Sequence, residues 1–230
     1  MAANNQQLKP QDFEILKPYV IVCEGKDDFG FLDEYLKYLD TLNFIKKNFF
    51  KIIKANGVNN ISKEMKNYKN YSNYDAMKGF LFVRDADNNP SSAVDSMIYN
   101  IKDVWNVQLD KTGDFKIDAD GVKIGFFIFP GLDDSGNYRK GTLEDFCTEI
   151  FNFSDGNTQV ILSLVEEHMK KLSDSEITFK TPHKNKLHLC LDSTNDFLGD
   201  KIGESARKNA FDFSSDKFSV LKTRIIDLAK

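Results

Sequence analysis

The sequence predicts an α/β fold, in which a mostly parallel sheet of about four strands is flanked by helices. Two observations lead to this prediction. Short runs of consecutive apolar residues, typical of strands buried on both faces, alternate with segments whose apolar residues recur at helical spacing. The repeated order of strand, then helix, favours parallel strands joined by right-handed crossovers.

The first strand is expected at Tyr19 to Cys23, a run of five apolar residues with strong β propensity. Glu24 and Gly25 follow at once, which indicates a strand that ends in a tight turn. From Asp28 onward the apolar residues recur every three or four positions, so the turn is expected to lead into a helix that ends near residue 40.

The same alternation of strand and helix repeats twice and is followed by a fourth strand. The predicted strands cover residues 49–55, 79–83 and 122–130, and the predicted helices run to about residue 69 and over about 92–105. Residues 118–121, just before the fourth strand, have the composition of a hairpin turn.

After Pro130 the alternation weakens and helices dominate. Thr142 is expected to open a helix as its N-cap, a further helix is expected near residues 160–172, and two more helical stretches follow. The sequence shows no linker and no repeat. It therefore indicates a single domain over residues 1–230, with a core over 15–150 and a helical C-terminal extension over 151–230 packed on that core.

The composition is that of ordinary globular material, with 41% hydrophobic and 29% charged residues. The longest apolar run, residues 125–129, is far too short to cross a bilayer, and residues 1–10 contain no apolar signal region. We therefore expect a cytoplasmic protein without a membrane partner. The three cysteines are widely spaced and lack a CxxC pair, so we expect them to be buried rather than disulfide-bonded or bound to zinc.

Acidic side chains follow the first and third predicted strands at the point where each strand ends. Glu24 follows the first strand, and Asp85 and Asp87 follow the third. Ligands bind at the carboxyl ends of the strands in open parallel sheets, so we expect these side chains to lie close together. Neighbouring carboxylates repel one another unless a cation lies between them, and Mg²⁺ and Mn²⁺ prefer carboxylate oxygens. The sequence therefore predicts a metal site at this edge.

These residues also carry a resemblance to a known family. A strand ending in Glu24-Gly25-x-x-Asp28, followed later by a strand ending in Asp85-x-Asp87, resembles the two signature motifs of the Toprim domain. That domain occurs in topoisomerases, primases and the overcoming-lysogenization-defect (OLD) nucleases. The sequence GTLEDF at 141–146 is similar to a stretch of small stand-alone Toprim proteins related to those nucleases, as are residues 202–206 and 211–213.

The resemblance implies a Toprim-like, Rossmann-like fold and a nuclease that hydrolyses phosphodiester bonds with one or two metal ions. It implies that Glu24, Asp85 and Asp87 hold one Mg²⁺ or Mn²⁺ ion, and that Glu144 with Asp28 holds a second. Glu24, Asp85, Asp87 and Glu144 are accordingly the candidate catalytic residues.

Nucleic acid is the partner that the resemblance implies, with DNA favoured over RNA. Related nucleases use a phosphate-facing lysine in the segment that corresponds to residues 182–186, which contains Lys184 and Lys186; Lys186 is the candidate for contacting substrate. The net charge of −4 is unusual for a nucleic-acid-binding protein, but bound cations would offset part of it.

Other interpretations remain open for these residues. Acidic side chains at helix N-termini, such as Asp28 and Glu144, also stabilise the helix without any function. A Toprim fold that binds metal or nucleic acid without turnover, as a subunit or regulator with a protein partner or a second copy of itself, is the main alternative. Its support is the absence of the ATPase domain that larger nucleases of this type carry. Lysines and tyrosines over residues 63–74 are typical of single-strand binding surfaces, although a solvated helix and loop explain them more simply.

Three other classes of acidic site fit the sequence less well. Haloacid-dehalogenase phosphatases carry their DxD motif after the first strand, where this sequence has Glu24-Gly25. A response-regulator receiver would leave Glu24 and Asp87 unexplained and would need a lysine after the last strand. An EF-hand needs glycine where Pro90 stands and glutamate where Ser96 stands.

Overall fold

The sheet has five strands in the order β2-β1-β3-β5-β4. The computed structural model describes residues 17–68, 74–152 and 156–230. Its strands are β1 (Tyr19–Cys23), β2 (Phe50–Lys54), β3 (Gly79–Asp85), β4 (Lys116–Ile117) and β5 (Lys123–Phe129). All neighbours are parallel except β4, which pairs antiparallel with β5. The predicted α/β fold with a mostly parallel sheet is confirmed, and β4 is an additional edge strand.

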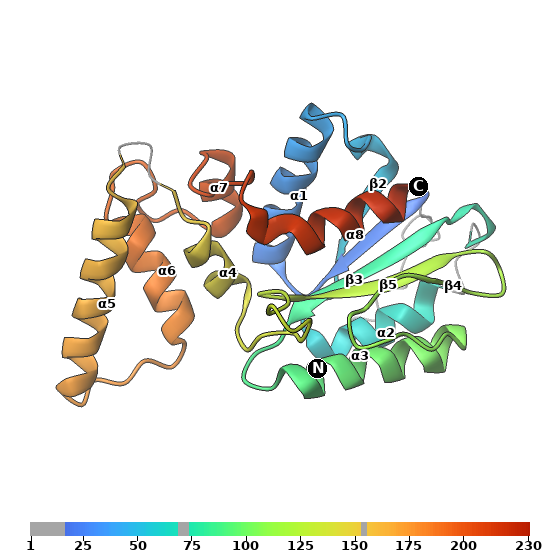
Figure 1. Cartoon of the computed structure of the whole chain (residues 1–230), viewed down its shortest axis with the longest axis horizontal. Helices are drawn as coiled ribbons and strands as arrows, with labels where there is room; N and C mark the ends of the chain where they lie inside the picture. The colour runs from blue at the N-terminus through green and yellow to red at the C-terminus, as the bar shows by residue number, and fades with distance from the viewer. Residues whose placement is uncertain (1–16, 69–73, 153–155) are drawn as a thin grey trace, which may run out of the picture.

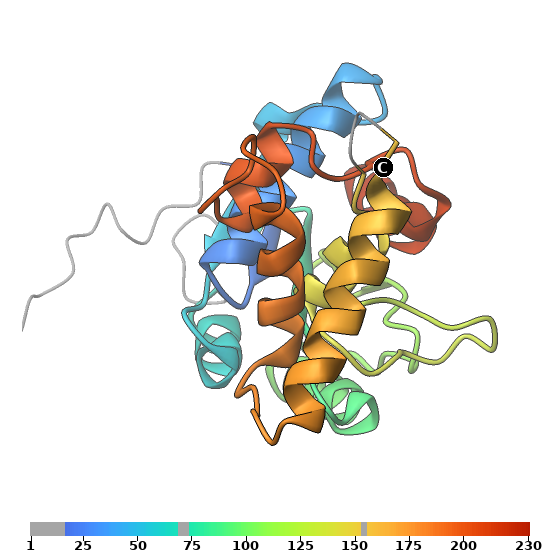
Figure 2. The same cartoon turned by 90° about the vertical axis from the view of Figure 1, so that its left-hand side faces the viewer.

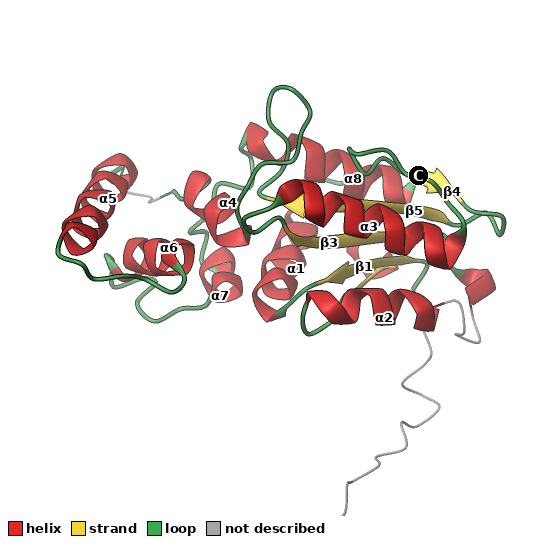
Figure 3. Ribbon diagram, turned by 90° about the horizontal axis from the view of Figure 1, so that it is seen from below, coloured by secondary structure: helices red, strands yellow, loops and turns green. Residues whose placement is uncertain are grey.

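Helices cover both faces of this sheet (Figures 1 and 3). The helices α2 (Val58–Tyr68) and α3 (Pro90–Trp105) lie on one face, while α1 (Lys26–Thr41) and α8 (Ser219–Ala229) lie on the other. Three short 3₁₀ turns, at Lys47–Phe49, Tyr74–Ala76 and Asp216–Phe218, join these elements. The strands between the layers are buried on both sides, which explains their uninterrupted apolar sequences.

The helix α8 completes the layer that α1 begins, because it packs against β3 and β5. The Tyr19 hydroxyl donates to the carbonyl oxygen of Ala229 over 3.0 Å, and Lys123 Nζ donates to the carbonyl oxygen of Asp227 over 2.9 Å. A Cβ on Gly79 would lie 2.5 Å from Leu228 Cδ1, so helix and strand are in close contact. The C-terminal helix is therefore part of the core.

Four further helices lie between β5 and α8, namely α4 (Leu143–Glu149), α5 (Thr158–Asp174), α6 (Pro182–Asp192) and α7 (Ile202–Arg207). Thr142 is the N-cap of α4, as predicted. The helices α5 and α6 pack side by side at one end of the molecule, beyond α4 (Figures 1 and 2). Three helices follow α5 in the described part of the chain, where two were expected, because α7 has only six residues and shows no apolar period. No described helix combines the length and apolar character needed to cross a membrane.

A cluster of phenylalanine rings joins the C-terminal helices to the sheet. Phe31 of α1 packs against Phe129 of β5, Phe146 of α4 and Phe218, with ring centroids 6.1 Å apart in each pair. Phe146 and Phe218 lie edge to face at 5.0 Å. Each such pair adds about 0.5–1.5 kcal/mol beyond the area it buries. The segment after residue 150 is thus anchored to the core by aromatic contacts.

The predicted turn at 118–121 is held by a buried hydrogen-bond network. Asp118 Oδ2 accepts from the Tyr74 hydroxyl over 2.9 Å, and that hydroxyl accepts from Trp105 Nε1 over 2.8 Å. Asp118 Oδ1 accepts from the backbone N–H groups of Asp120 and Val122, each over 2.9 Å. Tyr74 is therefore a core residue, and so is the fully buried Tyr68, so neither belongs to a binding surface over residues 63–74.

Replacing Asp118 with alanine is expected to lower the free energy of unfolding by about 1–3 kcal/mol, because it leaves buried donors without an acceptor. Urea denaturation measures the change. Asp120→Ala is the matched control, since Asp120 is exposed in the same turn and its replacement should change stability by less than about 0.5 kcal/mol. Equal losses in the two variants would show that the network does not hold the hairpin.

Candidate metal centre

The strand order creates a crevice at the carboxyl ends of β1 and β3. In the chain β1 is followed by β2 on one side, and β3 then pairs with β1 on the other side. The intervening helices α1 and α2 lie on opposite faces of the sheet (Figure 1). Such a switch in direction separates the loops above the two strands and is where α/β sheets bind their ligands. Glu24 directly follows β1, and Asp85 is the last residue of β3.

The loop after β1 turns sharply into α1 and is held by Asp28. Gly25 is the N-cap of α1, and its backbone N–H donates to Asp28 Oδ2 over 2.9 Å. The Glu24 carbonyl oxygen accepts from the N–H of Gly57 over 2.9 Å, which ties this loop to the loop after β2. Asp28 therefore caps its helix with one oxygen, the structural role considered from the sequence, while its other oxygen is buried without a hydrogen-bond partner among the described residues.

The loop after β3 is locked to the segment that precedes α4. Asp87 and Gly141 exchange two backbone hydrogen bonds of 2.9 Å each, with both residues at positive φ (52° and 136°). A Cβ on Gly141 would lie 2.8 Å from Asp145 Oδ2, so a side chain has no room there. The N–H of Leu143 donates to Asp85 Oδ1 over 2.9 Å. These contacts bring Glu144, in the first turn of α4, to the strand ends.

The carboxylates are close enough to perturb one another. Burial raises the pKa of Asp85 well above its usual value, and the charges of Asp28, Glu144 and Glu24 raise it further. The pKa of Asp28 rises from 3.8 to about 6, mainly through burial, with added repulsion from Glu24 and Glu144. Burial also raises the pKa of Glu24, where Arg84 opposes the shift and the charge of Asp87 adds to it. All five predicted metal-site residues therefore lie within electrostatic reach of the cluster.

Two carboxylate oxygens in this cluster lack a hydrogen-bond partner. Glu24 Oε2 and Asp28 Oδ1 are buried and accept no hydrogen bond from any described residue. Burying such an oxygen without a partner is costly, and a bound cation would remove the cost. All donors are carboxylates, which suits Mg²⁺ or Mn²⁺. Within the described ranges, no three histidine, cysteine, aspartate or glutamate side chains already stand in a metal-holding arrangement.

A lysine from α6 contacts the acidic cluster. Lys184 Nζ lies 3.0 Å from Oε1 of the buried Glu144. Burial by itself lowers the pKa of Lys184, but the contact with Glu144 and the charges of Asp27 and Asp85 outweigh it, so the pKa is raised. Lys186 lies elsewhere, with its Nζ 2.6 Å from Glu166 Oε1 on α5. Residues two apart on a helix face different directions, so only one of these lysines can reach the cluster. Once a helix over 182–192 is recognised, helical phase shows that the two lysines face different directions, but not which of them meets the cluster.

The fold and its acidic edge define the class: an α/β protein whose strand-end carboxylates meet at the switch point of a mostly parallel sheet. The chain belongs to the family described as protein of unknown function DUF3226, whose model matches residues 18–229. That match includes the core and all the helices that follow it. Searches of curated proteins and of solved structures found no match.

Proposed function

We propose that this protein is a metal-dependent phosphodiesterase of the Toprim type, which cleaves nucleic acid with Mg²⁺ or Mn²⁺. One observation carries the proposal. The carboxylates of Glu24, Asp28, Asp85 and Glu144 come from three separate segments and converge at the carboxyl edge, where two of their buried oxygens have no partner. The order of the acidic motifs, which resembles that of Toprim domains, gives the proposal its reaction class.

In this proposal Glu24, Asp85 and Asp87 hold one metal ion, and Glu144 with Asp28 holds a second. Bound ions of this kind polarise phosphoryl oxygens and lower the pKa of a bound water. The protein orients the carboxylates: the N–H of Leu143 fixes one oxygen of Asp85, and the N–H of Gly25 fixes one oxygen of Asp28. Lys184 contacts one oxygen of Glu144, Oε1, and we expect its ammonium group to face the substrate phosphate from there.

The direct test is cleavage by the purified protein. Supercoiled plasmid DNA and a structured RNA are incubated with Mg²⁺, with Mn²⁺ or with EDTA, and nicked products are separated on gels. We expect metal-dependent nicking, with DNA cut more readily than RNA. No cleavage of either nucleic acid with either metal would contradict the proposal.

The second candidate function is a Toprim-like module that binds metal or nucleic acid without turnover. The contact between Lys184 and Glu144 favours it, because a fixed ammonium group already neutralises one member of the cluster. The capping bonds of Asp28 and Asp85 also give these residues a structural role. Saturable Mn²⁺ binding without any nicking would support this function over the first.

The stabilising effect of Mn²⁺ is expected to depend on pH. A carboxyl group whose pKa is higher in the folded than in the unfolded protein stabilises the fold at low pH, and this contribution is lost as pH rises through the folded pKa. For Asp28 that window runs from 3.8 to about 6, and the shift of Asp85 has the same sign. These two groups therefore make the metal-free protein less stable as pH rises over this range. Mn²⁺ competes with these protons, so it should raise the melting temperature more at about pH 7.5 than at about pH 5.

Differential scanning fluorimetry with and without Mn²⁺ at the two pH values measures this effect. Glu24→Gln should reduce the Mn²⁺-dependent shift at the higher pH, whereas Asp120→Asn, at the opposite end of the sheet, should leave it unchanged. A melting temperature that rises equally at both pH values would place the bound ion away from the cluster.

A further inference from the structure

A groove of about 220 Å³ lies beside the acidic cluster, between α1, α7 and the end of β2. Lys26 and Phe29 of α1, Lys54 of β2, and Lys201 and Arg207 at the two ends of α7 contribute to its walls. Asp27, next to Asp28 in the first turn of α1, lines the same groove. The groove and the cluster therefore share the first turn of α1.

The groove exists because α1 and α7 approach each other at two glycines. A Cβ on Gly30 would lie 2.9 Å from Gly203 Cα, and a Cβ on Gly203 would lie 2.8 Å from Gly30 Cα. Both glycines line the groove, so the contact between the two backbones forms part of its surface. Charged side chains of α1 and α7 also line the groove.

Three of the four acidic residues that line the groove, Asp33, Glu34 and Glu204, have partners, whereas three of its lysines form no ion pair within the described residues. Asp33 pairs with Lys47 over 2.6 Å and with Lys37 over 3.1 Å. Glu34 pairs with Lys37 over 2.8 Å and with Arg207 over 3.1 Å. Glu204 accepts from the backbone N–H of Lys201 over 3.0 Å.

In contrast, Lys26, Lys54 and Lys201 are exposed and form no ion pair with any carboxylate in the described part of the chain. Lys54 Nζ lies 5.2 Å from the centre of the Phe29 ring, a contact that holds the ammonium group at the groove without neutralising it. The four basic and four acidic residues that line the groove balance in formal charge. Its three unpaired lysines nevertheless leave ammonium groups available there, because Asp33 and Glu34 are held in ion pairs with other residues. An anion can bind there without displacing an internal partner.

The position of the groove suits an extended polyanion that also reaches the acidic cluster. Lys54 of β2 pairs with Cys23 of β1, and Cys23 is the residue just before Glu24. Lys26 follows Gly25 directly. We propose that this groove binds backbone phosphates of a single nucleic-acid strand on the β2 side of the scissile bond. The inference rests on the proposed nuclease function and adds to it the side of the acidic cluster from which the nucleic-acid strand approaches.

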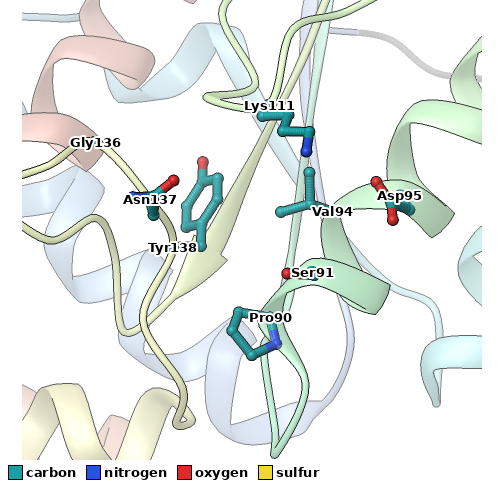
Figure 4. A pocket seen from close by; sticks show the side chains of 8 residues that line it. All are labelled: Pro90, Ser91, Val94, Asp95, Lys111, Gly136, Asn137 and Tyr138. Atoms are coloured by element: carbon teal, nitrogen blue, oxygen red, sulfur yellow. The ribbon is translucent and has the colours of Figure 1, made fainter.

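Other hollows offer less for an anion. The cavity between the start of α3 and the loop that carries Tyr138 measures about 80 Å³, room for a few water molecules, and contains one lysine, Lys111, alongside Asp95 (Figure 4). A wider hollow of about 470 Å³ contains Arg139 and Lys217. Both of these side chains already pair with Glu149, over 2.7 Å and 2.8 Å, so neither is free for a ligand.

The test is the salt dependence of strand binding. Fluorescein-labelled single-stranded DNA and RNA oligonucleotides are titrated with wild-type protein and with Lys54→Gln/Lys201→Gln in EDTA, over a range of NaCl concentrations. Each lost phosphate contact should reduce the slope of log K against log[NaCl] by about 0.7, so the double variant should lose about 1.4 from a steeper wild-type slope. The loss should be equal for DNA and RNA, because the contacts are with phosphates.

Two double variants serve as controls, one for the charge of the groove lysines and one for their position on the surface. Lys54→Arg/Lys201→Arg keeps the positive charge and should retain the wild-type slope. Lys78→Gln/Lys116→Gln removes the same charge from exposed lysines at the amino end of the sheet and should also retain it. Circular dichroism confirms that each variant is folded.

The two proposals fail in different ways. An unchanged slope in Lys54→Gln/Lys201→Gln, or wild-type protein that binds neither oligonucleotide, overturns the groove even when metal-dependent nicking is observed. Groove-dependent binding by a protein that never cleaves overturns the nuclease function and assigns the groove to the non-catalytic module.

Discussion

Asp85→Asn is expected to reduce metal-dependent cleavage at least about 100-fold, because loss of a residue that only supports a metal ligand already costs about 10–100-fold. Asparagine keeps the size of the side chain and an oxygen that can accept from the N–H of Leu143. It removes the negative charge that a metal ion would neutralise. Glu24→Gln should act in the same way, since Oε2 of Glu24 is one of the two unpartnered oxygens. Initial rates of plasmid nicking at saturating Mn²⁺ measure both effects.

A stability measurement separates lost chemistry from lost structure. The raised pKa of Asp85 means that its charge is unfavourable in the folded protein, so Asp85→Asn should keep or raise the melting temperature in EDTA. Asp134→Asn removes a charge from an exposed loop position and should change neither rate nor stability. Cleavage that survives both Asp85→Asn and Glu24→Gln would show that the activity does not belong to this cluster.

Gly203→Ala is expected to lower the free energy of unfolding by about 1–3 kcal/mol, the usual cost of forcing an extra group into a packed contact. In an ordinary helix position the same change stabilises by about 0.5–1 kcal/mol, so the two expectations differ in sign. The new methyl group would meet the backbone of Gly30 at 2.8 Å, and backbone atoms cannot rotate away. The helices α1 and α7 would have to separate. Urea denaturation monitored by circular dichroism gives the change.

Asn59→Ala, at an exposed position of α2, is the control for helix propensity and should be neutral or slightly stabilising. Gly30→Ala probes the same contact from the other helix, where a Cβ would lie 2.9 Å from Gly203 Cα. The Gly30 and Gly203 variants should therefore lose similar amounts of stability. A Gly203→Ala protein as stable as wild type would mean that α7 does not pack so closely on α1 that a Cβ at position 203 meets the backbone of Gly30.

The parts of the fold that the sequence predicted are those with strong local patterns. The strand β1 is apolar at each of its five positions, and the turn after it contains glycine, so its end could be located to the residue. The two-residue strand β4 is exposed throughout and has no pattern of its own; it is a strand only because it pairs with β5. The short helix α7 is defined by its contact with α1 rather than by its own sequence.

The same distinction holds for the candidate site. The meeting of Glu24 with Asp85 follows from parallel pairing of β1 with β3. The alternation of strands and helices predicted parallel strands with a shared carboxyl edge, but not which strands are neighbours. The approach of Lys184 to Glu144 depends on how α6 packs against α4, which no local pattern encodes. The groove was unpredictable for the same reason, because it depends on Gly30 and Gly203 meeting across a long stretch of chain.

The docking of α8 onto β3 and β5 bears on how this chain is synthesised. As the polypeptide leaves the ribosome, all five strands emerge well before α8, which is the last described element. Until α8 arrives, part of one apolar face of the sheet stays open to water, and exposed faces of this kind associate with one another. The hydrogen bond from Tyr19 to Ala229 can form only after α8 has been synthesised. We therefore expect a nascent chain of this protein to be most prone to aggregation between the synthesis of β5 and that of α8.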